Sequence, residues 1–198
     1  MSAAHRPVGR PDKTDERTAQ ILAAMAGVVA RDGLTGATIS KVAEAAGLRR
    51  TLVLHYFGNR DRLVDAFLTQ TVAAYGTAMV NIDRLTTAQL IDAAFEPGIY
   101  HSDLDLAVWL DLVALAARDP AVRDRLHRLW RESWLPAIAG RIVAQFPGTD
   151  AERAHSVAYA LVAVFEGHWS LVAQGVPTAT DTAAAKSAAH ALIGTLAR

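Results

Sequence analysis

The sequence of 198 residues contains no cysteine. This absence excludes disulfide bonds, thiolate metal sites and cysteine nucleophiles. No apolar run reaches the length of about 18 residues that a membrane span needs, so no membrane partner is expected. The basic stretch 1–13 is polar and has no apolar segment behind it, so we expect no signal peptide. With only 7 Pro and 13 Gly, collagen-like and Pro-rich classes are excluded.

Motifs of the common enzyme classes are also missing. The sequence has no Gly-x-Ser-x-Gly, no glycine-rich phosphate loop and no His-x-x-x-His pair. Glu152 and His155 have the spacing of some metal ligands, but two such residues near a helix start are usually solvated. We therefore expect no enzyme and neither a metal nor another cofactor.

An excess of charge of one sign is absent from the whole chain but present in its parts. Lys plus Arg and Asp plus Glu both number 20, so the formal net charge is zero. Residues 1–63 hold ten basic and six acidic residues, a net charge of +4, and the remainder therefore carries −4. Four of the ten basic residues lie around one short segment, namely Arg49, Arg50, Arg60 and Arg62. This asymmetry favours an anionic partner for the N-terminal part.

Four helices are predicted in the first 80 residues, after a flexible basic arm at 1–13. Apolar residues recur at helical spacing in each helix, between capping residues and glycines. The helices are expected from Thr14 to Gly33, from the cap Thr38 to Gly47, from Arg50 to Tyr56, and from the cap Asn59 to about Val80.

The second and third of these helices form a candidate helix-turn-helix. The helices cross closely at Ala43, which must be small, and Gly47 supplies a left-handed turn without a Cβ penalty. Val42, Ala46, Leu48 and Val53 are expected to fill the small core between them. Three-helix arrays without DNA affinity show the same pattern, so the spacing alone leaves DNA binding open.

Two stretches here resemble the DNA-binding domain of the tetracycline-repressor (TetR) family. They are residues 38–48 (TISKVAEAAGL) and 54–63 (LHYFGNRDRL). The family pattern has Thr capping the second helix, a [Val/Leu]-Ala-x-x-Ala-Gly turn, and an aromatic–Phe pair that closes the third helix. The resemblance covers about residues 14–67. It implies a helix-turn-helix domain at 14–60 that binds double-stranded DNA, with helix 59–80 as a connector.

Candidate base contacts begin the third helix. Arg49, Arg50 and Thr51 lie where such a helix enters the major groove with its N-terminus first. An arginine there can donate two hydrogen bonds to guanine, and simple solvated charge is the alternative for both arginines.

Candidate phosphate contacts flank that helix. Thr38 and Ser40 lie at a helix N-terminus, where free backbone N–H groups attract an anion. The resemblance implies phosphate contacts for Thr38, Tyr56 and Arg60. For His55, a backbone contact and an exposed spacer are both open.

The stretch departs from the family pattern at two positions. Arg49 stands where the family usually has a capping Ser or Thr, so a side-chain cap is not expected there. Leu54 stands where the family usually has a Tyr, and Leu54 cannot donate a hydrogen bond to a phosphate. Both changes put any transferred operator sequence in doubt.

The C-terminal region, 81–198, is predicted to be a helical bundle, which makes the whole fold all-α. Helices are expected at 86–95, 103–118, from Pro120 to near Pro147, at 150–175 and at 182–196, with Pro136 bending the third. The inward stripe of helix 103–118 is predicted to be Leu106, Trp109, Leu110, Val113 and Ala117.

The last two helices are the candidate dimer interface. From Val157 to Trp169 the chain is apolar on nearly every side, apart from Glu166 and His168, so burial on both faces is expected. Small residues on the final helix permit close approach of another helix. Pairing of these two helices across a two-fold axis would form a homodimer, and a core within one chain is the alternative.

The C-terminal half resembles the effector domain of BetI-type (betaine-inhibitor-like) repressors over about residues 80–175. The segments that carry the resemblance are 107–110, 116–123, 130–134 and 165–169. The resemblance implies a homodimer whose C-terminal half binds a small-molecule effector.

Aromatic side chains are the candidate walls of an effector pocket, and such a cage suits a quaternary ammonium ion. The candidate effector-binding residues are Phe95, Trp109, Trp130, Trp134, Phe165, Glu166 and Trp169, with Tyr100 as a further aromatic candidate. Aromatic residues at helical spacing also form plain core, and that alternative stays open for each. Glu166 and His168 need a partner or a ligand because they interrupt an apolar helix.

These observations predict a cytoplasmic, ligand-responsive TetR-type regulator. It is expected to be a repressor that binds a palindromic operator as a homodimer and is released by a small-molecule inducer. The alternative is a helical module that binds a small molecule or a protein and keeps this fold without binding DNA.

Overall fold

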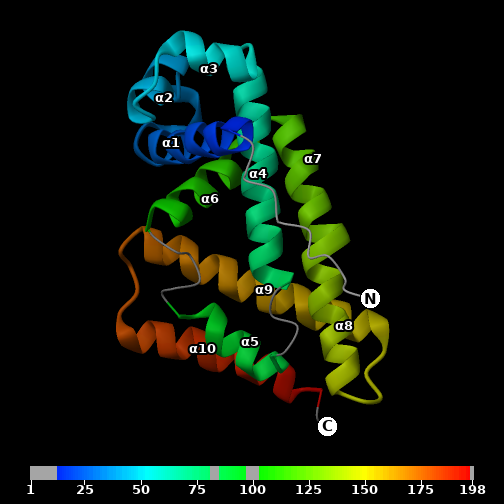
Figure 1. The fold of residues 1–198 in the computed structure, drawn as a ribbon. Helices are drawn as coiled ribbons and strands as arrows, with labels where there is room; N and C mark the ends of the chain where they lie inside the picture. Colours follow the sequence, from blue (N-terminus) through cyan, green and yellow to red (C-terminus); the bar gives the residue numbers. More distant parts are fainter. Residues whose placement is uncertain (1–12, 81–84, 97–102, 197–198) are drawn as a thin grey trace, which may run out of the picture. The chain divides into compact units, whose positions relative to one another are not determined.

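The computed structural model describes residues 13–80, 85–96 and 103–196, and it is helical with no strand in these ranges (Figure 1). The all-α fold predicted from the sequence is therefore confirmed. The chain divides into two compact units between Phe67 and Leu68. The basic arm at 1–13 falls outside the described ranges except for Lys13, and Tyr100 falls outside them as well.

Unit 1 has the helices that the sequence predicts. They are α1 (Lys13–Gly36), α2 (Ile39–Ala45), α3 (Arg50–Phe57) and the start of α4 (Arg60–Val80), which continues across the division. Gly33 interrupts α1 with a φ of 70° and a ψ of 163°, so the predicted stop is a break followed by one more turn. The predicted caps are present, because Thr38 accepts a hydrogen bond from the Lys41 amide and Asn59 from the Arg62 amide.

The core of unit 1 consists of the apolar stripes read from the sequence. Helix α1 contributes five side chains at helical spacing, and α2 and α3 close over them. Its fully buried members are Ile21, Met25, Val28, Val29, Val42, Val53 and Leu63. Phe57 and Phe67 complete the buried surface at the ends of α3 and of the unit. This small core holds α2 and α3 in a fixed relation.

Unit 2 contains the remaining helices. They are α5 (Thr87–Ala94), α6 (Asp103–Ala116), α7 (Pro120–Arg128), a π-helical segment η2 (Leu129–Trp134), α8 (Leu135–Gln145), α9 (Ala151–Ala173) and α10 (Ala179–Gly194). Helix α10 begins before the predicted residue 182, because Thr178 and Asp181 form a capping box. In Figure 1, α5 lies beside α10, and α9 runs past both.

A π-helical segment lies just before Pro136, where the sequence predicts a bend. Proline has no amide hydrogen and its ring crowds the carbonyl of the residue four positions earlier, here Glu132. The Leu135 amide instead donates to the Trp130 carbonyl, five residues back. Apolar residues recur every four positions in this stretch, which is slightly more than the 3.6 residues of an α-helical turn. The wider π-helical turn compensates for part of this difference. It thereby keeps Trp134 buried together with Ile138.

Two apolar clusters fill unit 2. The pocket cluster joins α5, α8, α9 and α10, and includes Leu90, Ile138, Ala158, Leu161 and Ile193. The tryptophan cluster joins α6, α7, η2 and α9, and includes Leu106, Trp109, Leu126, Trp134, Phe165 and Trp169. The predicted position of Val113 on the inward stripe of α6 is wrong, because its side chain is 43% exposed while Leu112 is fully buried. Since α6 is apolar around most of its circumference, periodicity did not identify the inward face.

One face of α9 is exposed within the single chain, so burial on both faces stays a prediction that depends on a partner subunit. Tyr159 is 63% exposed and Leu171 is 45% exposed, and Ala163 and Gly167 lie between them on the same face. By length and composition α9 is the one helix in the described ranges that qualifies as a membrane span, which is weak evidence because core helices qualify too. Its buried face, with Ala154 and Ala158 at zero exposure, packs in the pocket cluster.

The backbone at Gly47 gives a prediction for stability. Its φ is +66°, and a Cβ added there would meet no atom within 4 Å, as is also true of Gly27 inside α1. We expect Gly47→Ala to lower the free energy of unfolding by about 1–2 kcal/mol, because a left-handed residue with a Cβ is strained. Urea unfolding followed by circular dichroism measures this change.

The matched control is Gly27→Ala, which adds the same methyl group to a helical backbone. We expect this variant to raise the free energy of unfolding by about 0.5–1 kcal/mol, since alanine is the better helix former. Equal effects of the two substitutions would contradict a backbone origin for the requirement at Gly47.

Candidate DNA-binding surface and effector pocket

The turn between α2 and α3 fixes where α3 begins. The Gly47 amide donates to the Glu44 carbonyl at 3.0 Å, and the Leu48 amide donates to the Ala43 carbonyl at 2.9 Å. From α1, the Gln20 side chain donates to the Ala46 carbonyl at 2.9 Å. The end of α2 is thus held both by its own backbone and by a neighbouring helix, which leaves little freedom in the placement of α3.

The N-terminus of α3 presents three polar side chains to solvent. Arg49, Arg50 and Thr51 are all exposed. Arg49 is the N-cap residue of α3 and makes no side-chain capping hydrogen bond, as its departure from the family pattern led us to expect. Its guanidinium is therefore not engaged in closing the helix. Exposed, fixed side chains at a helix start are what contact with a groove requires.

The N-terminus of α2 places Thr38 and Ser40 at the surface of unit 1. Both are exposed, and the Thr38 hydroxyl oxygen accepts from the Lys41 amide at 3.3 Å. The Lys41 ammonium pairs with Asp32 at 2.7 Å, and that hydrogen bond and charge hold the pKa of Asp32 below its usual value. This pair neutralises a lysine next to the candidate phosphate contacts.

The C-terminal side of α3 carries two more predicted contacts. His55 is exposed and Tyr56 is half-buried, and their rings meet edge to face with centroids 5.6 Å apart. The ring of Tyr56 is therefore oriented by packing, and its hydroxyl remains the group offered as a phosphate contact.

Arg60 has a structural role that the sequence did not reveal. Its Nε donates to the Ala37 carbonyl at 2.9 Å and its Nη2 donates to the Leu34 carbonyl at 2.6 Å. These carbonyls belong to the end of α1 and to the loop before α2, so Arg60 ties the start of α4 to both. No sequence signal marks these acceptors, because they are backbone atoms. The phosphate contact of Arg60 stays a prediction.

The predicted effector residues of unit 2 separate into two groups. The first group surrounds the indole of Trp109, which donates from Nε1 to Oε2 of Glu166 at 2.8 Å. The ring of Trp134 lies 5.6 Å from that of Trp109 and 4.5 Å from that of Trp130, between ring centroids. Burial raises the pKa of the Glu166 carboxyl, and the hydrogen bond from Trp109 opposes that rise.

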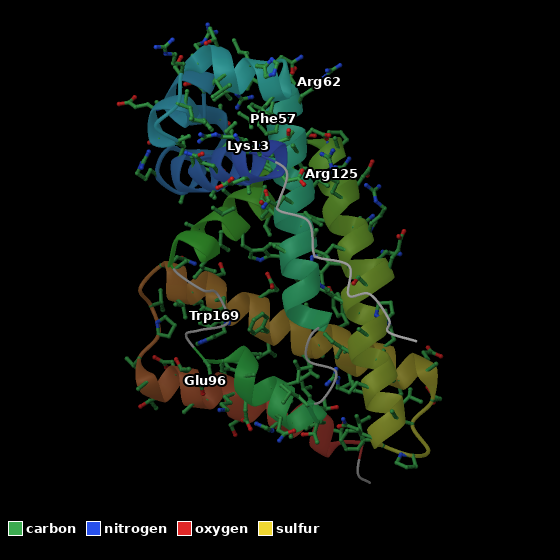
Figure 2. All side chains as sticks on the ribbon, viewed as in Figure 1. Lys13, Phe57, Arg62, Glu96, Arg125 and Trp169 are labelled. Atoms are coloured by element: carbon green, nitrogen blue, oxygen red, sulfur yellow. The ribbon has the colours of Figure 1, made fainter. Side chains whose placement is uncertain are left out.

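The second group consists of Phe95, Phe165 and Trp169. Phe165 packs edge to face against Phe95 with ring centroids 6.3 Å apart, and against Trp169 with centroids 6.2 Å apart. Trp169 projects from α9 toward α5, where its Nε1 donates to the Ala94 carbonyl at 2.9 Å (Figure 2). His168 lies 5.1 Å from Phe95, between ring centroids, and burial lowers the pKa of its imidazole.

An apolar pocket opens beside this second group. Its volume is about 40 Å³, and helices α5, α8, α9 and α10 contribute its walls. The lining residues are Leu90, Ile91, Ala94, Phe95, Ile138, Leu161, Val162, Phe165 and Ala189. Phe95 and Phe165 are the predicted residues among them, whereas Trp109, Trp130, Trp134, Glu166 and Trp169 do not line it. The aliphatic lining residues carry no sequence signal, because they look like any other core position.

Helix α5 covers the pocket and is fixed to the bundle at three places. Gln145 accepts hydrogen bonds from the amide and the hydroxyl of Thr87, at 2.7 and 2.9 Å. Asp92 pairs with His190 at 2.9 Å and with Lys186 at 3.1 Å, both on α10, and these hydrogen bonds lower its pKa. Trp169 holds the end of α5 through the Ala94 carbonyl.

This chain is similar in sequence to bacterial transcriptional regulators. Residues 21–67 match the family model described as bacterial regulatory proteins, tetR family. A BetI transcriptional regulator of Paraburkholderia phymatum is 27% identical over 166 residues, covering 77% of this chain and 79% of the relative. The BetI regulator of Burkholderia lata is also 27% identical, over 91% of this chain and 93% of the relative.

Solved structures share the fold. A putative transcriptional regulator from Pseudomonas aeruginosa superposes with a TM-score of 0.76 at 19% identity, covering 94% of this chain and 93% of that one. A putative TetR-family regulator from Rhodococcus sp. superposes with a TM-score of 0.70 at 23% identity, covering 92% of this chain and 100% of that one. Residues 21–67 thus match the DNA-binding domain of the TetR family, and over most of its length the chain is similar to transcriptional regulators of the BetI type.

Proposed function

We propose that this TetR-type regulator is a repressor that binds a palindromic operator as a homodimer and is released by a small-molecule inducer. The observation that carries the proposal is the exposed N-terminus of α3, with Arg49, Arg50 and Thr51 on a helix fixed by its turn. The comparisons favour DNA as the partner because they match this domain to bacterial regulatory proteins. Since its target is DNA, we expect the protein in the cytoplasm.

In this proposal, contacts are divided between bases and phosphates. Arg49, Arg50 and Thr51 enter the major groove and read base edges, while Thr38, Ser40, His55 and Tyr56 contact phosphates on either side. Phosphate contacts set the register of the protein on DNA, and base contacts supply sequence preference. Arg60 acts mainly by holding α4 against the end of α1, which positions the domain for these contacts.

The exposed faces of α9 and α10 support dimerisation. The face of α10 that points away from unit 2 is built of small exposed residues, namely Ala183, Ala184, Ser187, Ala188 and Ala191. Tyr159 and Leu171 are exposed on α9, and exposed large apolar side chains that share a face mark an interaction surface. Small residues let a partner helix approach closely. A two-fold pairing of α9 and α10 would cover both faces and place two DNA-binding domains on one operator.

Induction follows from a population shift. An effector that binds unit 2 more tightly in the arrangement unable to bind DNA draws the dimer away from its operator. The proposed site for the effector is unit 2, where the pocket and the two aromatic groups lie. Helix α4 runs from unit 1 into unit 2, so it is the element through which such a shift would act.

A binding experiment tests the DNA contact. We expect Arg50→Ala to weaken binding to the DNA that flanks the protein's own gene by about tenfold or more, because a bidentate arginine–guanine contact contributes about 1–3 kcal/mol. Fluorescence anisotropy at a fixed salt concentration measures the dissociation constant. Arg123→Ala is the control, since Arg123 is an exposed arginine of α7 in unit 2.

The outcomes separate the two functions considered. Equal losses for Arg50→Ala and Arg123→Ala would show that only general charge matters. No binding of the wild-type protein to this DNA at low salt would instead favour the alternative, a helical binding module that keeps the fold without binding DNA. The missing side-chain cap at Arg49 is the observation that keeps this alternative in view.

A second experiment tests the dimer. We expect Ala188→Arg to convert the protein to a monomer and to weaken operator binding at least about 100-fold, since a charge buried at an interface is costly. Sedimentation velocity measures the oligomeric state. Ala137→Arg is the matched control, because Ala137 is an equally small, exposed residue within α8. A dimeric Ala188→Arg protein would contradict pairing through α10.

A further inference from the structure

Two buried polar atoms near the indole of Trp109 have no hydrogen-bond partner in the described ranges. They are Nε1 of Trp134, whose side chain is 4% exposed, and Oε1 of Glu166. Trp109 is in contact with both residues, through its hydrogen bond to Oε2 of Glu166 and through ring packing against Trp134. Buried polar atoms without a partner are rare in native proteins and cost about 1–3 kcal/mol each. Two of them beside one side chain indicate a missing group.

The two atoms are complementary in hydrogen-bonding character. An indole N–H only donates, and a carboxylate oxygen accepts. A hydroxyl satisfies both atoms at once, because its oxygen accepts from Trp134 while its hydrogen is donated to Glu166. A quaternary ammonium ion has neither a hydrogen to donate nor a lone pair to accept with, and a carboxylate would be repelled by Glu166. The pattern therefore favours an uncharged group.

The surroundings determine the rest of the ligand. Val162 lies one helical turn before Glu166 on the same face of α9, and Val162 lines the apolar pocket. Phe165 and Ala94 both line this pocket and pack in the tryptophan cluster. All nine residues that line the pocket are apolar. A ligand with its polar end at Glu166 and Trp134 would thus place a hydrocarbon body in this pocket.

We propose that unit 2 binds an uncharged apolar alcohol or phenol, whose hydroxyl bridges Trp134 Nε1 and Glu166 Oε1 and whose hydrocarbon part fills the pocket beneath α5. The inference rests on the proposed effector role of unit 2 and names the chemical class of the effector. Burial raises the pKa of Glu166, because a negative charge is costly in this environment. A neutral hydroxyl adds no second negative charge beside it, whereas an anionic ligand would.

The test uses four probes that share a six-carbon chain and differ in the head group. They are 1-hexanol, hexylamine, hexyltrimethylammonium and hexanoate, each titrated into the full-length protein by isothermal titration calorimetry at neutral pH. We expect 1-hexanol to bind at least about tenfold more tightly than the other three, since each leaves a buried polar atom unsatisfied. Tighter binding of hexyltrimethylammonium or hexylamine would overturn the proposal in favour of a cation site.

A pair of variants tests the contact itself. Trp134→Phe removes the unpartnered N–H, whereas Ser156→Ala removes a donor on α9 that already donates to the Glu152 carbonyl, away from the pocket and both apolar clusters. We expect Trp134→Phe to weaken 1-hexanol binding about tenfold and Ser156→Ala to leave it within about threefold, from the usual contribution of one hydrogen bond. Circular dichroism confirms that each variant is folded. Equal affinity of Trp134→Phe and wild-type protein would overturn the proposal and point to a buried water at this place.

The proposed effector role and the proposed ligand site of unit 2 are tested by separate readouts. If 1-hexanol binds with the expected dependence on Trp134 but does not change operator binding in the anisotropy assay, the ligand site stands and induction through it is wrong. If no probe binds while the operator is still recognised, the ligand class proposed for unit 2 is wrong and DNA binding stands. Both readouts use the same protein preparation.

Discussion

The constraint on which this fold depends is that the ends of helices leave backbone polar groups that need partners. Short helices have many ends, and at several junctions a side chain of this chain supplies the partner. Arg60 donates to the carbonyls of Leu34 and Ala37, and Trp169 donates to the carbonyl of Ala94. These bonds do more than satisfy single atoms, because each ties the end of one helix to the side chain of another. The relative placement of helices within each unit follows from them.

Local signals in the sequence predict the helices well, because caps and glycines act over a few residues. Thr38, Gly47 and Asn59 give the limits of α2, α3 and α4 as the structure has them. The start of α10 was missed, since Asp181 in place of the usual Glu or Gln hid a capping box with Thr178. The inward face of α6 was missed at Val113 for a different reason. On a helix that is apolar on most sides, hydrophobic periodicity does not distinguish the buried face from the exposed face.

The candidate sites differ in how far the sequence predicts them. The exposed start of α3 is readable because it depends on a turn of a few residues, Gly47 to Thr51. The pocket depends on four helices far apart in the sequence, so the sequence identified Phe95 and Phe165 but not the aliphatic walls. Glu166 stood out because it interrupts an apolar helix. Its hydrogen bond to Trp109, 57 residues away, becomes visible only in the folded chain.

In the two proposals for unit 2, helix α9 carries both the ligand contact and the dimer face. Glu166 faces the tryptophan cluster, and the next residue, Gly167, lies on the exposed face that we assign to the partner subunit. A ligand that bonds to Glu166 must favour one position of α9 over another if it is to act as an effector, because a ligand shifts an equilibrium only through differential binding. Any such shift moves the dimer face of the same helix. The conformations of the two subunits would then change together. One small molecule could in this way release two DNA-binding domains from one operator.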